Sequence, residues 1–172
     1  NAFFAEQINR SIGSISKKNW FTFHFQTQGA NQGREIAVDL LPHGLSIILE
    51  LFGDNLISNL REKYSTKRYA CQFEYGEHKV AFDFYENQKS IKKMTMELNG
   101  RQFTRRQEGD GAKYQVSFYD SHTLKKIEVE DPFKVYINRF LNSFQAGSLG
   151  NDGFKIAAKN LRLMGKILLG PT

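Results

Sequence analysis

The sequence predicts an α+β fold of two antiparallel β-sheet-plus-helix half-repeats (ββββα twice), packed together, with an extra C-terminal helix. Three observations favour this fold. A strand–proline–helix pattern occurs twice, at 35–52 and 126–144. Runs of alternating apolar and polar residues, typical of half-buried strands, fill the region between the two patterns. The Asn99-Gly100 dipeptide is typical of a two-residue β-hairpin turn.

The first half begins with a weakly amphipathic segment, 2–15. Two strands are expected next, at 20–26 and 34–39, on either side of a glycine-rich loop. After Pro42, apolar residues at helical spacing predict a helix through residue 56. The half therefore consists of strands closed by one helix, which can cover one face of its sheet.

The second half contains more strands, at 69–75, 79–85, 91–98, 101–106, 114–119 and 124–130. Its helix is expected to start at Pro132, with Asp131 as the N-cap. After a glycine-rich joint, 155–169 predicts a helix with one basic and one apolar side. Docking on the domain or contact with another subunit is favoured for this helix over an anionic surface.

These elements predict three parts of the chain. Residues 1–17 form an N-terminal segment, and residues 18–145 form the two-repeat domain, with halves at about 18–64 and 65–145. Residues 146–172 form the flexible joint and the basic amphipathic helix.

Composition limits the classes of function. The chain of 172 residues has a net charge of +6, and residues 61–126 hold fourteen Lys/Arg against nine Asp/Glu. A basic, strand-rich segment suits either a solvated surface or a surface for phosphates. The sequence contains no run of about 18 apolar residues, which is the pattern that predicts a membrane-spanning helix. Because the chain begins at Asn1, it is expected to be a fragment or a processed product, and no targeting segment indicates its compartment.

No pattern of catalytic or metal-binding residues is evident. The lone Cys71 is expected to be a small buried thiol. The four histidines, His24, His43, His78 and His122, have no metal-ligand spacing, and each is expected to have an ordinary structural role. We therefore expect no cofactor, no metal and no enzymatic activity.

The segment "KVAFDFYENQKSIKKM" (79–94) resembles the signature of the PUR repeat of purine-rich-element-binding proteins. The matching positions are Phe82, Asp83, Glu86–Lys89 and 91–96, and "QGREIAVDLLPHGL" (32–45) is similar to the other half of the motif. Ser90-Ile91 replaces the usual Gly-Arg. The strands-plus-helix unit used twice is also that of the Whirly proteins, and the element order is similar to kinetoplastid mitochondrial guide-RNA-binding proteins.

The resemblance implies a non-catalytic protein that binds single-stranded RNA or DNA on its sheet, with RNA and a mitochondrial location favoured, and that forms a homo- or hetero-oligomer. Cations would follow the phosphates and exposed rings would stack on bases. The candidate binding residues are Lys92, Lys93, Arg101, Arg105, Arg106, Lys89, Asn87, Tyr85, Trp20, His24, Arg34 and Tyr114.

Two other functions remain open at this point. The protein could be an oligomeric scaffold whose sheet and terminal helices pack on other subunits, with no direct contact to nucleic acid. Alternatively, an apolar concavity of the sheet could carry a lipid or another hydrophobic ligand.

Overall fold

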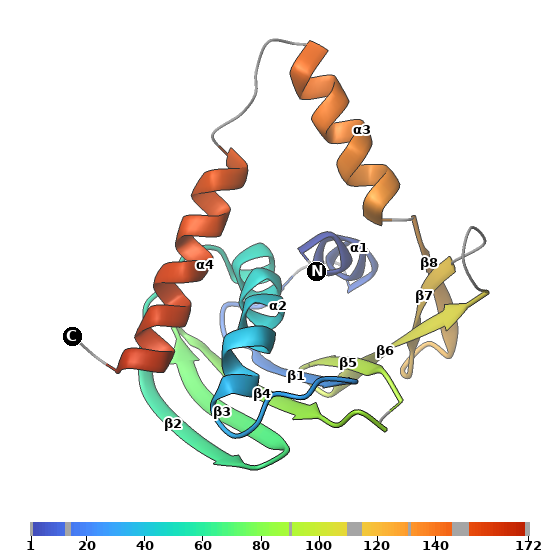
Figure 1. Ribbon diagram of the computed structural model, residues 1–172. Helices are drawn as coiled ribbons and strands as arrows, with labels where there is room; N and C mark the ends of the chain where they lie inside the picture. The colour runs from blue at the N-terminus through green and yellow to red at the C-terminus, as the bar shows by residue number, and fades with distance from the viewer. Residues whose placement is uncertain are drawn as a thin grey trace.

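A single eight-stranded β-sheet organises the molecule (Figure 1). The computed structural model describes residues 2–12, 15–89, 91–109, 115–130, 132–145 and 152–170. The strand order is β2-β3-β4-β1-β5-β6-β7-β8. Only β1 and β4 run parallel, and the other six pairings are antiparallel. The strands are Trp20–Thr27 (β1), Ile57–Ser65 (β2), Arg68–Tyr75 (β3), His78–Glu86 (β4), Lys93–Leu98 (β5), Arg101–Glu108 (β6), Gln115–Asp120 (β7) and Lys125–Val129 (β8).

Helices lie on one side of this sheet (Figure 1). They are α1 (Ala2–Ile12), α2 (Glu35–Phe52), α3 (Pro132–Gln145) and α4 (Asp152–Leu169). Helix α2 packs on β3 and β4 and is flanked by α1 and α4. The core lies between α2 and the apolar side of the central strands, where Phe21, Phe23, Phe82 and Phe84 are fully buried. Within the described part of the chain, no helix lies on the other face of the sheet (Figure 1).

The predicted pair of half-repeats is wrong. All eight strands belong to one continuous sheet, and β1 from the first half is inserted between β4 and β5 from the second. The hydrophobic pattern indicated strands correctly, but it carried no information about their order. Because β1 is apolar on alternate positions, Phe21, Phe23 and Phe25, it is suited to a central position next to α2.

The predicted strand at 34–39 is also wrong, because residues 35–39 belong to α2, which continues through Pro42. A proline inside a helix removes one backbone hydrogen bond and costs about 3 kcal/mol. Burial of one whole side of α2 offsets this cost, since Ile36, Leu40, Leu41 and Leu45 are each at most 2% exposed. Tertiary packing thus outweighs the helix-breaking preference of Pro42. Because 35–52 is one continuous helix, the apparent internal repeat of strand, proline and helix is not present in the structure.

The remaining predicted strands are confirmed within a few residues, and so is the hairpin at Asn99-Gly100. Both turn residues have positive φ, and the pairs Leu98–Arg101, Met96–Phe103 and Thr95–Thr104 have the expected register. Cys71 is buried, which raises the pKa of its thiol to about 12. Strand β2, at 57–65, was not predicted from the sequence.

The two C-terminal helices differ in how they are covered. Helix α4 docks on α2: the Asn160 side chain donates to the Pro42 carbonyl at 3.1 Å, and Arg162 pairs with Asp54. Docking was the favoured prediction for this helix. Helix α3, in contrast, does not cover the sheet as predicted, and it leaves an apolar stripe exposed. The stripe consists of Ile137, Phe140, Leu141 and Phe144.

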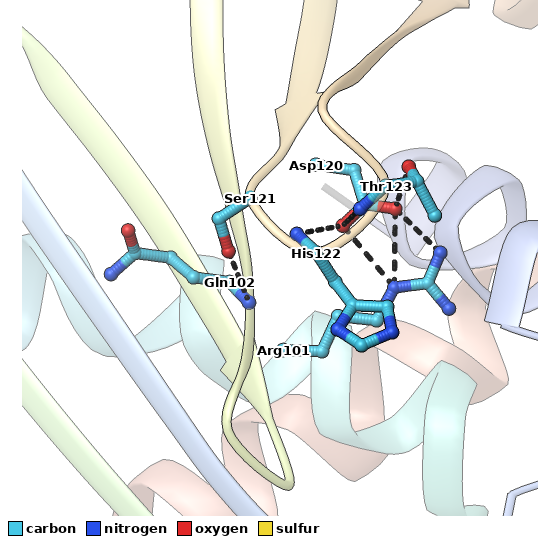
Figure 2. Close-up of polar contacts among 6 residues, drawn as sticks. All are labelled: Arg101, Gln102, Asp120, Ser121, His122 and Thr123. Atoms are coloured by element: carbon cyan, nitrogen blue, oxygen red, sulfur yellow. Dashed lines mark hydrogen bonds and ion pairs between the residues drawn. The ribbon is translucent and has the colours of Figure 1, made fainter.

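Asp120 organises the turn between β7 and β8, and Figure 2 shows its contacts. The carboxylate is 1% exposed and accepts bonds from both Nε and a terminal nitrogen of Arg101, the shorter at 2.5 Å. It also accepts from the Thr123 hydroxyl at 2.6 Å and the His122 amide at 2.9 Å. These donors, Arg101 first, hold the pKa of Asp120 well below its usual range.

Gly44 allows α2 to approach the sheet closely. A Cβ at this position would lie 2.8 Å from the Phe82 ring. We therefore expect Gly44→Ala to lower the free energy of unfolding by about 1–3 kcal/mol, as other overpacked cores do. Denaturant titration measures the change. The control is Gly165→Ala in α4, where no atom lies within 4 Å, and alanine there is expected to stabilise by up to about 1 kcal/mol. Equal effects at both positions would contradict the close approach.

Candidate active site

Three loops meet at one end of the sheet. β4 and β1 run parallel, and β5 and β6 follow β1 in the sheet as successive antiparallel neighbours. The ends of β1, β4 and β6 therefore lie at the same end of the sheet as the start of β5. Backbone hydrogen bonds join the loops. The Gly33 amide donates to the Thr66 carbonyl at 3.1 Å, and the Asn87 amide donates to the Thr27 carbonyl at 3.2 Å. Helix α2 starts at this end, so its first turns lie above the junction.

Glu86, the last residue of β4, is buried at the junction with 2% exposure. Its carboxyl accepts from the Asn31 amide at 2.9 Å. A Cβ on Gly29 would lie 2.0 Å from the same carboxyl, so the loop must have glycine there to approach it. Burial raises the pKa of Glu86, and the nearby Asp39 raises it further. Both causes favour the uncharged form of the Glu86 carboxyl.

Asp39 and His43 are four residues apart in α2, so they share one side of the helix. Burial lowers the pKa of His43, while the charge of Asp39 opposes this shift. The imidazole is half-buried and meets the Phe25 ring edge-on, with 5.2 Å between ring centroids. At neutral pH it is therefore a neutral base, positioned by an aromatic side chain and next to a carboxylate.

A cavity of about 320 Å³ opens at the same end of the sheet. Phe25 contributes to its wall, so the ring that contacts His43 also faces this space. A partly buried base, two carboxyl groups and an adjacent cavity form an arrangement that can bind a small molecule and exchange a proton with it. Among the described residues, no group of three or more side chains could hold a metal ion.

The sequence-predicted binding residues do not form one surface. Arg106 lies on the uncovered face with Trp20, His24 and Tyr85, and Lys93, where β5 begins, borders cavities on both faces. Arg101 and Arg105 lie on the helix side, because side chains alternate along β6. Lys92 precedes β5, and Asn87 and Lys89 lie in the β4–β5 turn. Arg34 lies at the start of α2, and Tyr114 is outside the described residues.

Several of the predicted cations have acidic or aromatic partners within the chain. Arg34 pairs with Glu62 at 2.9 Å, and Arg101 with Asp120. The Arg106 guanidinium lies 4.6 Å from the centre of the Tyr119 ring. On the uncovered face, Asp83 is held by both Arg68, at 2.6 Å, and His24, at 3.1 Å. This face is therefore a mixed polar surface with internal ion pairs.

Asp39, His43 and Glu86 were not among the predicted site residues. The signal that could have found Asp39 and His43 is their spacing of four residues, which places two ionisable groups on one side of a helix. That signal was lost because residues 34–39 were assigned to a strand. Glu86 was noted only as part of the turn motif, since its burial cannot be read from its neighbours in sequence.

Comparison with known proteins shows what the fold resembles. No protein-family model and no curated protein matches the chain. A dehydrogenase (MviM) from Clostridium difficile has a similar structure, with a TM-score of 0.61 and 12% identity over 97% of this chain and 58% of its own. The WlbA (WbpB) dehydrogenase from Thermus thermophilus, solved with NAD and alpha-ketoglutarate, has a TM-score of 0.51 and 13% identity. The match covers 99% of this chain and 53% of the dehydrogenase. A Gfo/Idh/MocA family oxidoreductase from Vibrio cholerae has a TM-score of 0.44 and 16% identity, over 83% of this chain and 48% of its own.

These findings overturn the resemblance to PUR and Whirly proteins. The structures that share the fold over nearly the whole chain are dehydrogenases and oxidoreductases, and their chains are much longer than the part that is matched. The expectations of a non-catalytic protein and of a single-stranded RNA or DNA partner are corrected with it, because both were implied by that resemblance. Within the described residues, no helix is both long and apolar enough to cross a bilayer.

Proposed function

We propose that this chain is the sheet-containing part of an NAD(P)-dependent oxidoreductase, and that His43 is its proton-transfer residue. The observation that carries the proposal is the extent of the likeness, which spans 97% of this chain but 58% of the MviM dehydrogenase. The end of the sheet described above supports it independently, because a base, two carboxyl groups and a cavity meet there.

The described residues do not fit a dinucleotide site of their own. Dinucleotide-binding sheets are mostly parallel, and a Gly-x-Gly-x-x-Gly turn follows their first strand. Here one pairing of seven is parallel, and the glycines after β1 are Gly29 and Gly33, with three residues between them. We therefore assign the nicotinamide dinucleotide to the part of an oxidoreductase that lies outside the matched region, and derive no chemistry for it here.

The chemistry of this chain is proton transfer. When a hydroxyl group is oxidised to a carbonyl, the proton on its oxygen must go to a base, and on reduction the same group must return it. His43 can do both, because burial keeps the imidazole neutral and Asp39 stabilises the imidazolium that forms. Glu86 lies near Asp39 and is itself fixed by the Asn31 amide.

Spectrophotometry of the full-length protein tests the proposal. The protein would be incubated with NAD⁺ or NADP⁺ and a panel of polyols, sugars and hydroxy acids. We expect reduced nicotinamide to accumulate with at least one of these compounds. Failure of the full-length protein to bind either dinucleotide, measured by calorimetry, would show that the proposal is wrong.

A further inference from the structure

The cavity bordered by Phe25, whose ring contacts His43, has a definite chemical character. Its lining combines an apolar floor of Phe4, Phe25 and Met94 with a polar rim of Lys92, Lys93, Arg105 and Gln107. At about 320 Å³ it is at the lower end of the range of about 300–1,000 Å³ for small-molecule pockets. The ligand is therefore expected to be small.

Three cations and no acidic side chain occur among the described residues that line the cavity. Lys93 is the first residue of β5, Lys92 precedes it, and Arg105 comes from the neighbouring strand β6. Like charges placed together next to an apolar floor repel one another and create a positive potential that attracts an anion. Arg105 is also oriented, because its guanidinium donates to the Gln107 side chain at 3.5 Å.

The floor connects the cations to the proton-transfer residue. Phe4 and Met94 are 7% and 3% exposed, so their side chains are packed in the core. Phe25 extends this surface to His43 through the edge-on ring contact. A ligand lying along the floor would thus have one end among the cations and the other against Phe25, whose ring contacts His43.

We propose that this cavity binds the anionic group, a carboxylate or a phosphate, of a small hydroxylated or carbonyl substrate, with the reacting carbon directed toward His43. The proposal rests on the proposed function, since it names the class of substrate for the same site. Arg105 binds the anion through its guanidinium, and Lys92 and Lys93 supply positive charge at the rim.

Adjacent arginines offer a matched test. Arg105 and Arg106 follow one another in β6, but their side chains lie on opposite faces of the sheet. Binding of three probes to the full-length protein would be measured by calorimetry: gluconate, 6-phosphogluconate, and the neutral polyol sorbitol. We expect Arg105→Gln to weaken binding of an anionic probe about tenfold or more, the loss expected for one charge-assisted hydrogen bond. Arg106→Gln should leave it unchanged.

Further variants separate charge from folding. Arg105→Lys, which keeps the charge, should recover part of the affinity, and Lys92→Gln should weaken binding by a smaller factor. The carboxylate and phosphate probes distinguish the two anionic groups. Equal affinity for sorbitol and both anions, or equal losses in Arg105→Gln and Arg106→Gln, would overturn the proposal. If the protein oxidises only neutral compounds, the anion site is wrong but the oxidoreductase function stands. If anions bind through Arg105 but no dinucleotide binds, the anion site is right and the oxidoreductase function is wrong.

Discussion

Replacing His43 with asparagine is expected to lower the rate of substrate oxidation about 100- to 10,000-fold, the usual contribution of a general base. Asparagine keeps a polar side chain of similar size but cannot accept the substrate proton at neutral pH. Because burial lowers the pKa of His43 below its ordinary value of 6.5, the wild-type oxidation rate should fall only when the pH drops below that value. Steady-state kinetics across a pH series measures both effects.

The control for His43 is His24 on the uncovered face, which is also next to an aspartate. His24→Asn should leave the oxidation rate within about twofold of wild type, since a surface residue remote from the cavity contributes no proton transfer. Asp39→Asn should have an intermediate effect, because the base remains but its imidazolium loses a stabilising charge. A His43 variant with the wild-type rate and pH profile would refute the assignment.

Replacing Asp120 with alanine is expected to lower the free energy of unfolding by about 3–5 kcal/mol, the cost of breaking a buried ion pair. The variant leaves the Arg101 guanidinium, only 21% exposed, without its carboxylate (Figure 2). It also removes the acceptor for the Thr123 hydroxyl and the His122 amide. Urea titration of the two proteins measures the difference.

The same experiment at low pH gives a second result. The pKa of Asp120 is lower in the folded protein, so its stabilisation is fully present above the unfolded value of about 3.9 and is lost as the pH falls through the folded pKa. The difference in free energy of unfolding between wild type and Asp120→Ala should therefore become smaller below about pH 4. As a control, Asp83 also pairs with an arginine, Arg68, but is 26% exposed, and Asp83→Ala should cost about 0–1 kcal/mol. Equal costs at both positions would contradict the role of burial.

Local sequence patterns predicted most elements of the fold but not their arrangement. Alternation identified β1 and β3 to β8, because a strand with one buried face must alternate. The position of β1 between β4 and β5 depends on long-range pairing, which leaves no local trace. Pro42 misdirected the prediction for α2, because its local preference is outweighed by packing against Phe82 and its neighbours.

The site was harder to predict than the fold. The predicted binding residues included cations from both sides of the strands, although alternation places Arg105 and Arg106 on opposite faces. The functional importance of Glu86 arises from its burial and from its contacts with Asn31 and Asp39, which are distant in sequence. Such groupings appear only when loops from separate strands are brought to the same end of the sheet.

The uncovered face also provides a natural optical probe. Trp20 is the only tryptophan in the chain, is 59% exposed on that face, and lies 5.9 Å from the Lys79 ammonium group. Its fluorescence therefore reports on that side of the molecule alone. Association through the bare strands would move its emission to shorter wavelengths by excluding water, whereas a ligand entering on the helix side would leave the spectrum unchanged.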